Sequence, residues 1–222
     1  MTSEEVIASL KAQSNPAGVA GMAHFGSRPA QALGLTMPVL RKIAREIGRN
    51  HPLALKLWAS GLHEGRILAS LLADPKQVSP ELMEDWVKDF DSWDVCDQVC
   101  GNLFDKTPYA YQKVLEWCHR EEEYVRRAGF VMMAELAVHD KKAPDEAFVP
   151  FFPLIKQYSW DERNFVKKAV NWALRQIGKR NNNLRGLAIQ WAEDIHQTGT
   201  KAGRWIASDA LREFRLKENS PA

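Results

Sequence analysis

The segment FDSWDVCDQVCGNLF, residues 90–104, carries the most unusual combination of side chains in the chain. At helical spacing, four of its residues fall on one face, at i, i+4, i+7 and i+11: Trp93, Asp97, Cys100 and Phe104. Asp97 therefore places a carboxylate within an otherwise apolar stripe. Because burying an unpaired carboxylate is costly, we predict that Asp97 is either paired or borders a cleft in which its charge is used. The helix dipole offers a simpler explanation for acidic residues in a first turn, and it accounts for Asp94 better than for Asp97.

A second aromatic residue lies beside positive charge further along the chain. On a helical wheel of residues 161–179, Trp172 falls at the edge of the apolar stripe. Phe165 lies on one side of it, and Lys168 and Arg175 lie on the other. This position suits stacking against a nucleotide, and it equally suits covering a hydrophobic seam between helices.

The elements that must position these residues are all predicted to be helices. Amphipathic segments follow one another at short intervals, Pro, Gly, Asn and Asp separate them, and no run shows sustained strand alternation. The sequence is therefore that of an all-α protein. We place helices near 3–13, 16–25, 37–49, 51–60, 63–73, 79–89, 93–104, 108–119, 121–138, 144–158, 161–179, 182–196 and 200–216.

Internal similarity indicates how these helices are arranged. VRRAGFVM at 125–132 aligns with VKKAVNWA at 166–173, 41 residues later, and NWALRQ at 171–176 aligns with SDALRE at 208–213, 37 residues later. Units recurring at about 40 residues are typical of HEAT or armadillo solenoids, although a compact helical bundle is the competing interpretation. We expect one repeat domain over 1–222, with a short disordered tail at about 217–222.

The repeat alignment also predicts which side chains are buried and which are cationic. Arg127 occupies the wheel position that Lys168 holds one repeat later, which predicts a basic stripe along one surface. The apolar stripes of the two helices are Val125, Ala128, Met132 and Leu136, followed by Val166, Ala169, Val170, Ala173 and Ile177.

The net charge of +2 averages over unlike segments. Residues 61–123 hold 14 acidic and 6 basic side chains, a balance of −8, whereas residues 156–217 hold 13 basic and 6 acidic ones, a balance of +7. The C-terminal third is thus the candidate surface for a polyanion, unless these helices are simply charged on their solvent side.

Composition and motifs argue against a membrane protein, a secreted protein and a protein that binds a metal or a nucleotide cofactor. The sequence carries no membrane-length apolar run and no signal-peptide pattern. Three cysteines fit a reducing compartment, so we expect a cytoplasmic protein. Cys96, Cys100, Cys118 and His119 lack the spacing of a zinc site, and we interpret the cysteines as buried free thiols. We therefore expect no metal, and because no phosphate-binding glycine motif is present we expect no nucleotide cofactor either. Five tryptophans are expected to pack between helices: Trp58, Trp86, Trp117, Trp191 and Trp205.

Several segments together resemble the AlkD-like family of DNA alkylation-repair glycosylases. Trp93-x-x-x-Asp97 resembles its tryptophan and catalytic aspartate, Tyr124-Val-Arg-Arg127 its segment with a DNA-contacting arginine, and Lys168-Ala-Val-Asn-Trp172-Ala-Leu-Arg175 its segment with a second active-site tryptophan. The stretch Gly34-Leu-Thr-Met-Pro-Val-Leu-Arg-Lys42 is similar to its early turn and helix. One departure is in Met22-Ala-His-Phe25, where the family tends to carry a tyrosine.

This resemblance implies a HEAT-like solenoid with a concave DNA-binding face and a monofunctional glycosylase that removes N7- and N3-alkylated purines from duplex DNA. It also implies that Asp97 is catalytic, that Trp93 and Trp172 hold the sugar and backbone, and that Arg127 clamps a phosphate. Lys168 and Arg175 would extend the phosphate contacts, and a monomer is the simplest expectation. Two alternatives remain: a non-catalytic DNA-structure binder on the same scaffold, and a protein-interaction scaffold.

Overall fold

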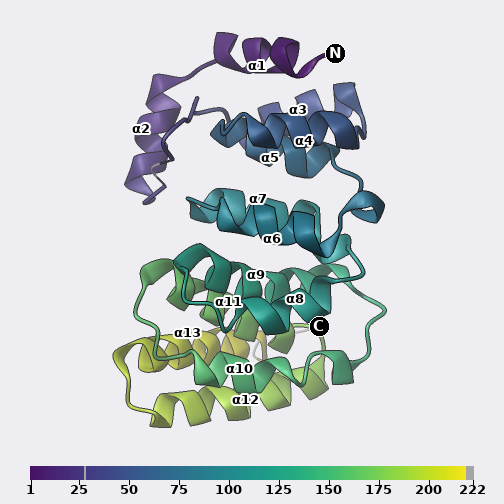
Figure 1. Cartoon of the computed structure of the whole chain (residues 1–222). Coiled ribbons are helices and arrows are strands. Elements are labelled where there is room, and N and C mark those ends of the chain that lie inside the picture. The colour runs from purple at the N-terminus through teal and green to yellow at the C-terminus, as the bar shows by residue number, and fades with distance from the viewer. Residues whose placement is uncertain (28, 219–222) are drawn as a thin grey trace. The chain divides into compact units, whose positions relative to one another are not determined.

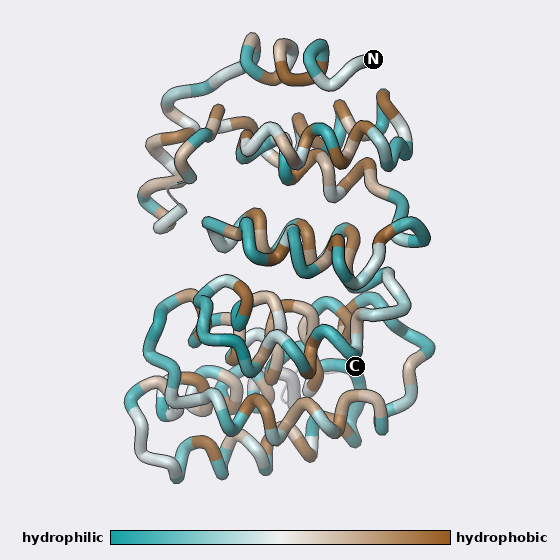
Figure 2. The backbone as a smooth tube through the Cα atoms, in the orientation of Figure 1, coloured by the Kyte–Doolittle hydropathy of each residue, from teal (hydrophilic) through white to brown (hydrophobic). Residues whose placement is uncertain are grey.

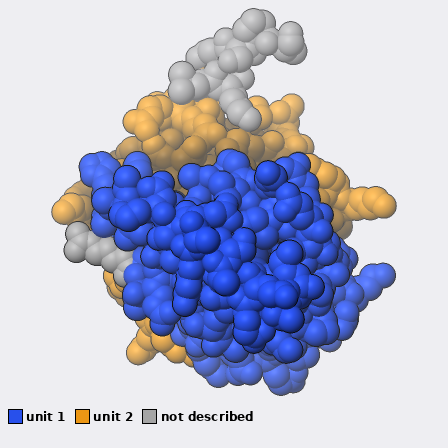
Figure 3. Space-filling model, turned by 90° about the horizontal axis from the view of Figure 1, so that it is seen from above, with its two compact units in different colours: residues 1–109 blue, residues 110–222 orange. Residues whose placement is uncertain are grey.

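The computed structural model describes residues 1–27 and 29–218, and every regular element among them is helical, as predicted (Figure 1). The chain divides into two compact units, Met1–Tyr109 and Ala110–Ala222, coloured blue and orange in Figure 3. The prediction of one repeat domain stays a prediction. The disordered tail expected at about 217–222 lies outside the described residues from residue 219 onward, and the last helix includes residues 217 and 218.

The described residues of unit 1 form seven α-helices and two short 3-10 helices. Within it, α5 contacts α3, α4 and α7, and α1 packs on α4. These elements are α1 (Ser3–Ala12), α2 (Pro16–His24), α3 (Met37–Ile47), α4 (His51–Ala59), α5 (His63–Leu72), η1 (Pro75–Gln77), α6 (Pro80–Lys88), α7 (Trp93–Asn102) and η2 (Phe104–Lys106).

Local signals explain where several of these helices begin. Thr2 and Glu5 form a capping box at α1, and the side chain of Asn50 accepts the backbone N–H of Leu53 at α4. Prolines stand in the first turns of α2, α3, α4 and α6, where a missing N–H costs little. Figure 2 shows hydrophobic and hydrophilic residues alternating along the helices, as expected of amphipathic segments.

Unit 2 contains the helices with internal sequence similarity. Its elements are α8 (Ala110–Trp117), α9 (Glu123–His139), η3 (Asp145–Ala147), α10 (Phe151–Gln157), α11 (Asn164–Gly178), α12 (Asn182–Gln197) and α13 (Lys201–Glu218). Helix α11 packs against both α9 and α13, while α12 covers α11 and α13. The predicted buried stripes of α9 and α11 are confirmed, since each of their nine residues is at most 2% exposed.

The contacts between α11 and α13 reproduce the repeat seen in the sequence. The amide Nδ2 of Asn171 donates to the carbonyl oxygen of Ile206 at 3.1 Å, and Arg175 reaches Asp209 one turn later at 3.2 Å. The contacts advance in the same direction along both helices, so α11 and α13 run parallel. Equivalent helices of successive repeats therefore lie side by side, as the spacing of about 40 residues predicted. None of the described helices is long and apolar enough to cross a membrane.

Candidate functional site

Helix α7 brings the two unit 1 candidates together at the edge of the core. Trp93 is its first residue, and Asp97 follows one turn later on the same face. Both side chains are half-buried, whereas Cys96, Val99 and Cys100 behind them are fully buried. Asp97 is engaged by a neighbouring group and is still partly open to solvent. Asp97 is therefore a paired carboxylate at the edge of the core, and its use in a cleft stays a prediction.

Asp94 is held by tertiary contacts that the sequence did not reveal, and its side chain is 19% exposed. Its Oδ1 accepts a hydrogen bond from Ser27 Oγ at 3.0 Å, and its Oδ2 lies 3.1 Å from His63 Nε2. Burial raises the pKa of the Asp94 carboxyl, but the interactions with its neighbours, those with His63 foremost, together outweigh burial and hold that pKa below its usual value. Asp94 is thus more than a partner of the helix dipole, which was its expected role.

Glu64, next to His63, fastens the segment between α2 and α3. Its carboxylate is 1% exposed and accepts the backbone N–H groups of Leu33, Gly34 and Leu35 at 2.7–3.2 Å. Three backbone donors that would otherwise be unsatisfied are thereby paired.

Phe25, at the end of α2, is 70% exposed. The AlkD-like family, which this sequence resembles, tends to carry a tyrosine in that region.

Helix α3 carries a cationic face that the sequence analysis did not single out. Arg41 and Arg45 are exposed one turn apart and line a groove of about 530 Å³ together with Pro38, Ala44 and Leu71. Among the described residues, neither arginine has a carboxylate partner. Their guanidinium groups are therefore available to an anion from solution. The sequence does contain a signal for this face, because Arg41 and Arg45 are four residues apart and therefore lie on the same side of a helix.

In unit 2, Arg127 is buried rather than displayed. It is 5% exposed, and its Nη1 donates to the carbonyl oxygen of Phe165 at 2.5 Å. Lys168, the equivalent residue of the next repeat, is exposed. The equivalence predicted from the sequence therefore does not produce a basic stripe, because the arginine fork bonds to a backbone carbonyl on the neighbouring helix.

Arg126, the residue before Arg127, forms an ion pair with Asp161, which lies just before α11. Its Nη1 lies 2.8 Å from Asp161 Oδ2, with the two side chains 8% and 2% exposed. Arg163 binds the same carboxylate. Burial raises the pKa of the Asp161 carboxyl, but hydrogen bonds from Arg163 and Arg126 outweigh it and lower that pKa below its ordinary value.

The three candidate residues of α11 differ in their surroundings. Trp172 is half-buried at the edge of the core, as its wheel position predicted. Lys168 has no acidic partner among the residues that the structure covers. Arg175 differs from the expectation, because its guanidinium binds Asp209 at 3.2 Å and Glu213 on α13. Asp209 is shared with Arg212 and Glu213 with Lys179, so these bonds direct the Arg175 guanidinium toward α13.

The tryptophans expected to pack between helices do so with one exception. Trp58 and Trp86 stack with ring centroids 4.0 Å apart, and Trp117 is fully buried. Trp191 is partly buried and stacks on Phe152. Trp205 differs in its burial: it is 41% exposed, although Lys167 Nζ of the neighbouring helix α11 lies over its ring at 5.1 Å. Trp205 lies about 100° around α13 from the core residue Ile206, outside the buried stripe of that helix.

The cysteines are buried free thiols, as predicted. Cys118 packs so closely on α9 that a Cβ at Gly129 would lie 2.7 Å from its sulfur. Burial raises the pKa of the Cys118 thiol far above its usual value, so this group stays protonated and inert.

Comparison with known proteins places this geometry in a family. No curated protein matches the chain. A solved structure described as "a new family of proteins related to the HEAT-like repeat DNA glycosylases with affinity for branched DNA structures" is similar, with a TM-score of 0.75 and 20% identity over 87% of this chain and 83% of that one. At this identity the likeness establishes the HEAT-like repeat fold. The model of the DNA alkylation repair enzyme family matches residues 6–214, and the chain belongs to that family.

Proposed function

We propose that this protein is a DNA glycosylase that hydrolyses the N-glycosidic bond of N7- and N3-alkylated purines in duplex DNA. One observation supports this most strongly. In a chain of the DNA alkylation repair enzyme family, Trp93 and Asp97 stand one turn apart at the solvent edge of the unit 1 core. An aromatic face and a carboxylate in that arrangement suit a sugar that becomes cationic as its base departs.

The proposed reaction needs little acid catalysis from the protein. An N7- or N3-alkylated purine carries a positive charge, so the base is a good leaving group and needs no strong general acid. The deoxyribose develops oxocarbenium character as the bond breaks. The Asp97 carboxylate stabilises that cation and orients the attacking water, while Trp93 offers its ring to the sugar. The reaction requires neither a metal nor an organic cofactor.

Binding to the DNA backbone is assigned to cations of both units. In unit 2, Lys168 contacts phosphate directly, Trp172 stacks beside it, and Arg127 clamps a phosphate with the N–H donors that its bond to the carbonyl of Phe165 does not use. In unit 1, Arg41 and Arg45 bind a further stretch of backbone. We assign Arg175 to packing between α11 and α13 because reaching DNA would cost it two carboxylates. The protein acts as a monomer.

Release of 7-methylguanine from methylated duplex DNA tests this function. Wild type should release the base, whereas Asp97→Asn should bind the same DNA and release it at least about 100-fold more slowly, the scale on which a single electrostatic group acts in catalysis. Asp85→Asn is the matched control, because Asp85 is an exposed carboxylate on the preceding helix α6 and should retain full activity. Absence of release by wild type across alkylated purines would refute the glycosylase assignment.

A second candidate is a non-catalytic binder of branched DNA. The words "affinity for branched DNA structures" describe the similar solved structure and favour this alternative. Wild type would then bind a four-way junction more tightly than a duplex of equal length and release no base from either. DNA affinity that is insensitive to salt, or absent, would instead favour a protein-interaction scaffold.

A further inference from the structure

Three segments that are far apart in the sequence meet at one carboxylate in unit 1. Ser27 follows α2, His63 begins α5, and Asp94 lies in the first turn of α7. Ser27 Oγ donates to Asp94 Oδ1 at 3.0 Å, and His63 Nε2 lies 3.1 Å from Asp94 Oδ2. Ser27 and the His63 side chain are each 2% exposed, so the cluster is largely shielded from water.

The chemistry of the cluster fixes which atoms donate. An ionised carboxylate only accepts hydrogen bonds, so Nε2 of His63 carries the proton that Asp94 receives. The other ring nitrogen, Nδ1, is buried without a hydrogen-bond partner among the described residues. Asp94 is therefore the one polar anchor of the His63 ring in that part of the chain. The backbone N–H of His63 also donates to the carbonyl oxygen of Gln31 at 2.8 Å, so the start of α5 is tied to the segment that contains Ser27.

The local bonds at the start of α7 also run through Asp94, whose Oδ1 accepts the backbone N–H of Val95 at 3.1 Å. The N-cap residue of this helix is Ser92, a good capping residue, yet the Ser92 side chain makes no capping hydrogen bond to the backbone of α7. The first turn of α7 is instead held through Asp94 by residues of two other segments. That turn bears Trp93 beside Asp94, and Asp97 follows within one turn.

We propose that His63 is a positioning residue: acting through Asp94, it fixes the first turn of α7 so that Trp93 and Asp97 keep the geometry required for catalysis. This inference rests on the proposed function for its catalytic part. His63 itself touches neither the DNA nor the reacting atoms, because its ring is enclosed behind Asp94. A misplacement of about 1 Å at the reacting groups is enough to lower a rate about 100-fold.

The test compares two buried histidines of unit 1. His51 begins α4, is 8% exposed and accepts the backbone N–H of Asp74 through Nδ1 at 3.3 Å. It resembles His63 in burial and in its place at a helix start, but its bond leads away from α7. We expect His63→Gln to lower the single-turnover rate of base release about 10- to 100-fold with DNA affinity unchanged. His51→Gln should lose comparable stability and keep the wild-type rate. Equal rates for the two variants would overturn the inference.

A second readout does not depend on chemistry. Amide hydrogen exchange at Val95 and Cys96, in the DNA-free protein, reports how firmly α7 begins. We expect His63→Gln to speed that exchange at least about tenfold relative to His51→Gln. If wild type releases no base, the proposed function fails while this measurement still decides whether His63 holds α7. Unchanged exchange in His63→Gln would show that it does not.

Asp94→Asn provides a variant that preserves shape if His63→Gln does not fold. The asparagine side chain retains an oxygen for one neighbour but loses the negative charge that His63 faces. We expect Asp94→Asn to show the same slower base release and the same faster amide exchange at Val95 and Cys96 as His63→Gln. Wild-type behaviour on both counts would overturn the inference.

Discussion

Arg127 Nη1 donates to the carbonyl oxygen of Phe165 at 2.5 Å and joins α9 to the first turn of α11. The arginine is 5% exposed, although the family resemblance assigns it a phosphate. Both roles fit one side chain, because a guanidinium has five N–H donors and can serve a carbonyl and a phosphate together. In the function that we propose, Arg127 is a structural link between repeats that also binds a phosphate.

Replacing Arg127 by Gln should therefore affect stability and binding at once. The loss of the charged donor to Phe165 should reduce the free energy of unfolding by about 1–3 kcal/mol. DNA affinity should fall as well, because a positive charge is removed. Urea unfolding and DNA titration of the same variant check both effects. Unchanged stability would mean that the bond to Phe165 contributes nothing in solution.

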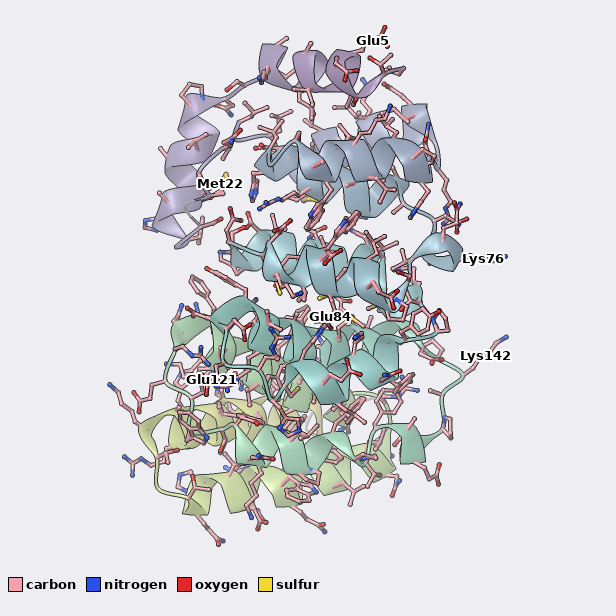
Figure 4. The ribbon with its side chains drawn as sticks, in the orientation of Figure 1. Glu5, Met22, Lys76, Glu84, Glu121 and Lys142 are labelled. Atoms are coloured by element: carbon pink, nitrogen blue, oxygen red, sulfur yellow. The ribbon has the colours of Figure 1, made fainter. Side chains whose placement is uncertain are left out.

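The cationic face of α3 should be visible in the salt dependence of DNA binding. The double variant Arg41→Gln/Arg45→Gln should bind more weakly, and its slope of log K against log salt should be shallower by about 0.9 for each phosphate that the variant no longer neutralises. Lys76→Gln is the control: Lys76 is exposed on η1 and extends away from the ribbon in Figure 4. A slope identical to that of wild type would exclude α3 from the binding surface.

Two cations of α11 should respond in opposite ways. Lys168→Gln should weaken DNA binding and leave stability within about 0.5 kcal/mol of wild type, because Lys168 is exposed. Arg175→Gln should destabilise the protein with little change in salt slope, because Asp209 and Glu213 lose their partner. Lys142→Gln, at a cation that also extends away from the ribbon in Figure 4, is the control for Lys168. If Arg175→Gln instead lowers the slope as much as Lys168→Gln, our assignment of Arg175 is wrong.

The buried pair of Arg126 and Asp161 should make stability depend on pH in acid. Asp161→Asn leaves Arg126 without its carboxylate and should cost about 3–5 kcal/mol at neutral pH. The pKa of Asp161 is lowered in the folded protein from its ordinary value of 3.8. Its contribution is therefore complete above that value and is lost as pH falls through the folded pKa.

Thermal unfolding of wild type and Asp161→Asn between neutral pH and strong acid checks this dependence. The difference between them should be constant above about pH 5, by which point the carboxyl is ionised in both states, and should shrink toward zero in strong acid. A difference that stays constant at all pH values would show that the charge of Asp161 is not what stabilises the pair.

Most of the fold could be predicted from the sequence because its signals are local. Prolines such as Pro52 and Pro80 mark helix starts, and the apolar periodicity around Val166 and Ala173 marks a buried face. The position of Asp97 at a core border followed from the same periodicity. These arguments need nothing beyond one helix.

The contacts that escaped prediction join residues far apart in the chain. Arg175 finds its acidic partners 34 and 38 residues further on, and Ser27 meets Asp94 across 67 residues. A helical wheel shows a charge on a surface but cannot show that another helix covers it. For the same reason Trp205, expected at an interface, is exposed, whereas Arg127, expected on a basic surface, is buried.

The most direct test of the central claim is single-turnover release of 7-methylguanine, with wild type and Asp97→Asn each saturating the methylated duplex. Under that condition the rate reports chemistry alone, because binding is complete. We predict rapid release by wild type and a loss of at least about 100-fold in Asp97→Asn with DNA affinity preserved. Equal rates for the two proteins would contradict a catalytic role for Asp97.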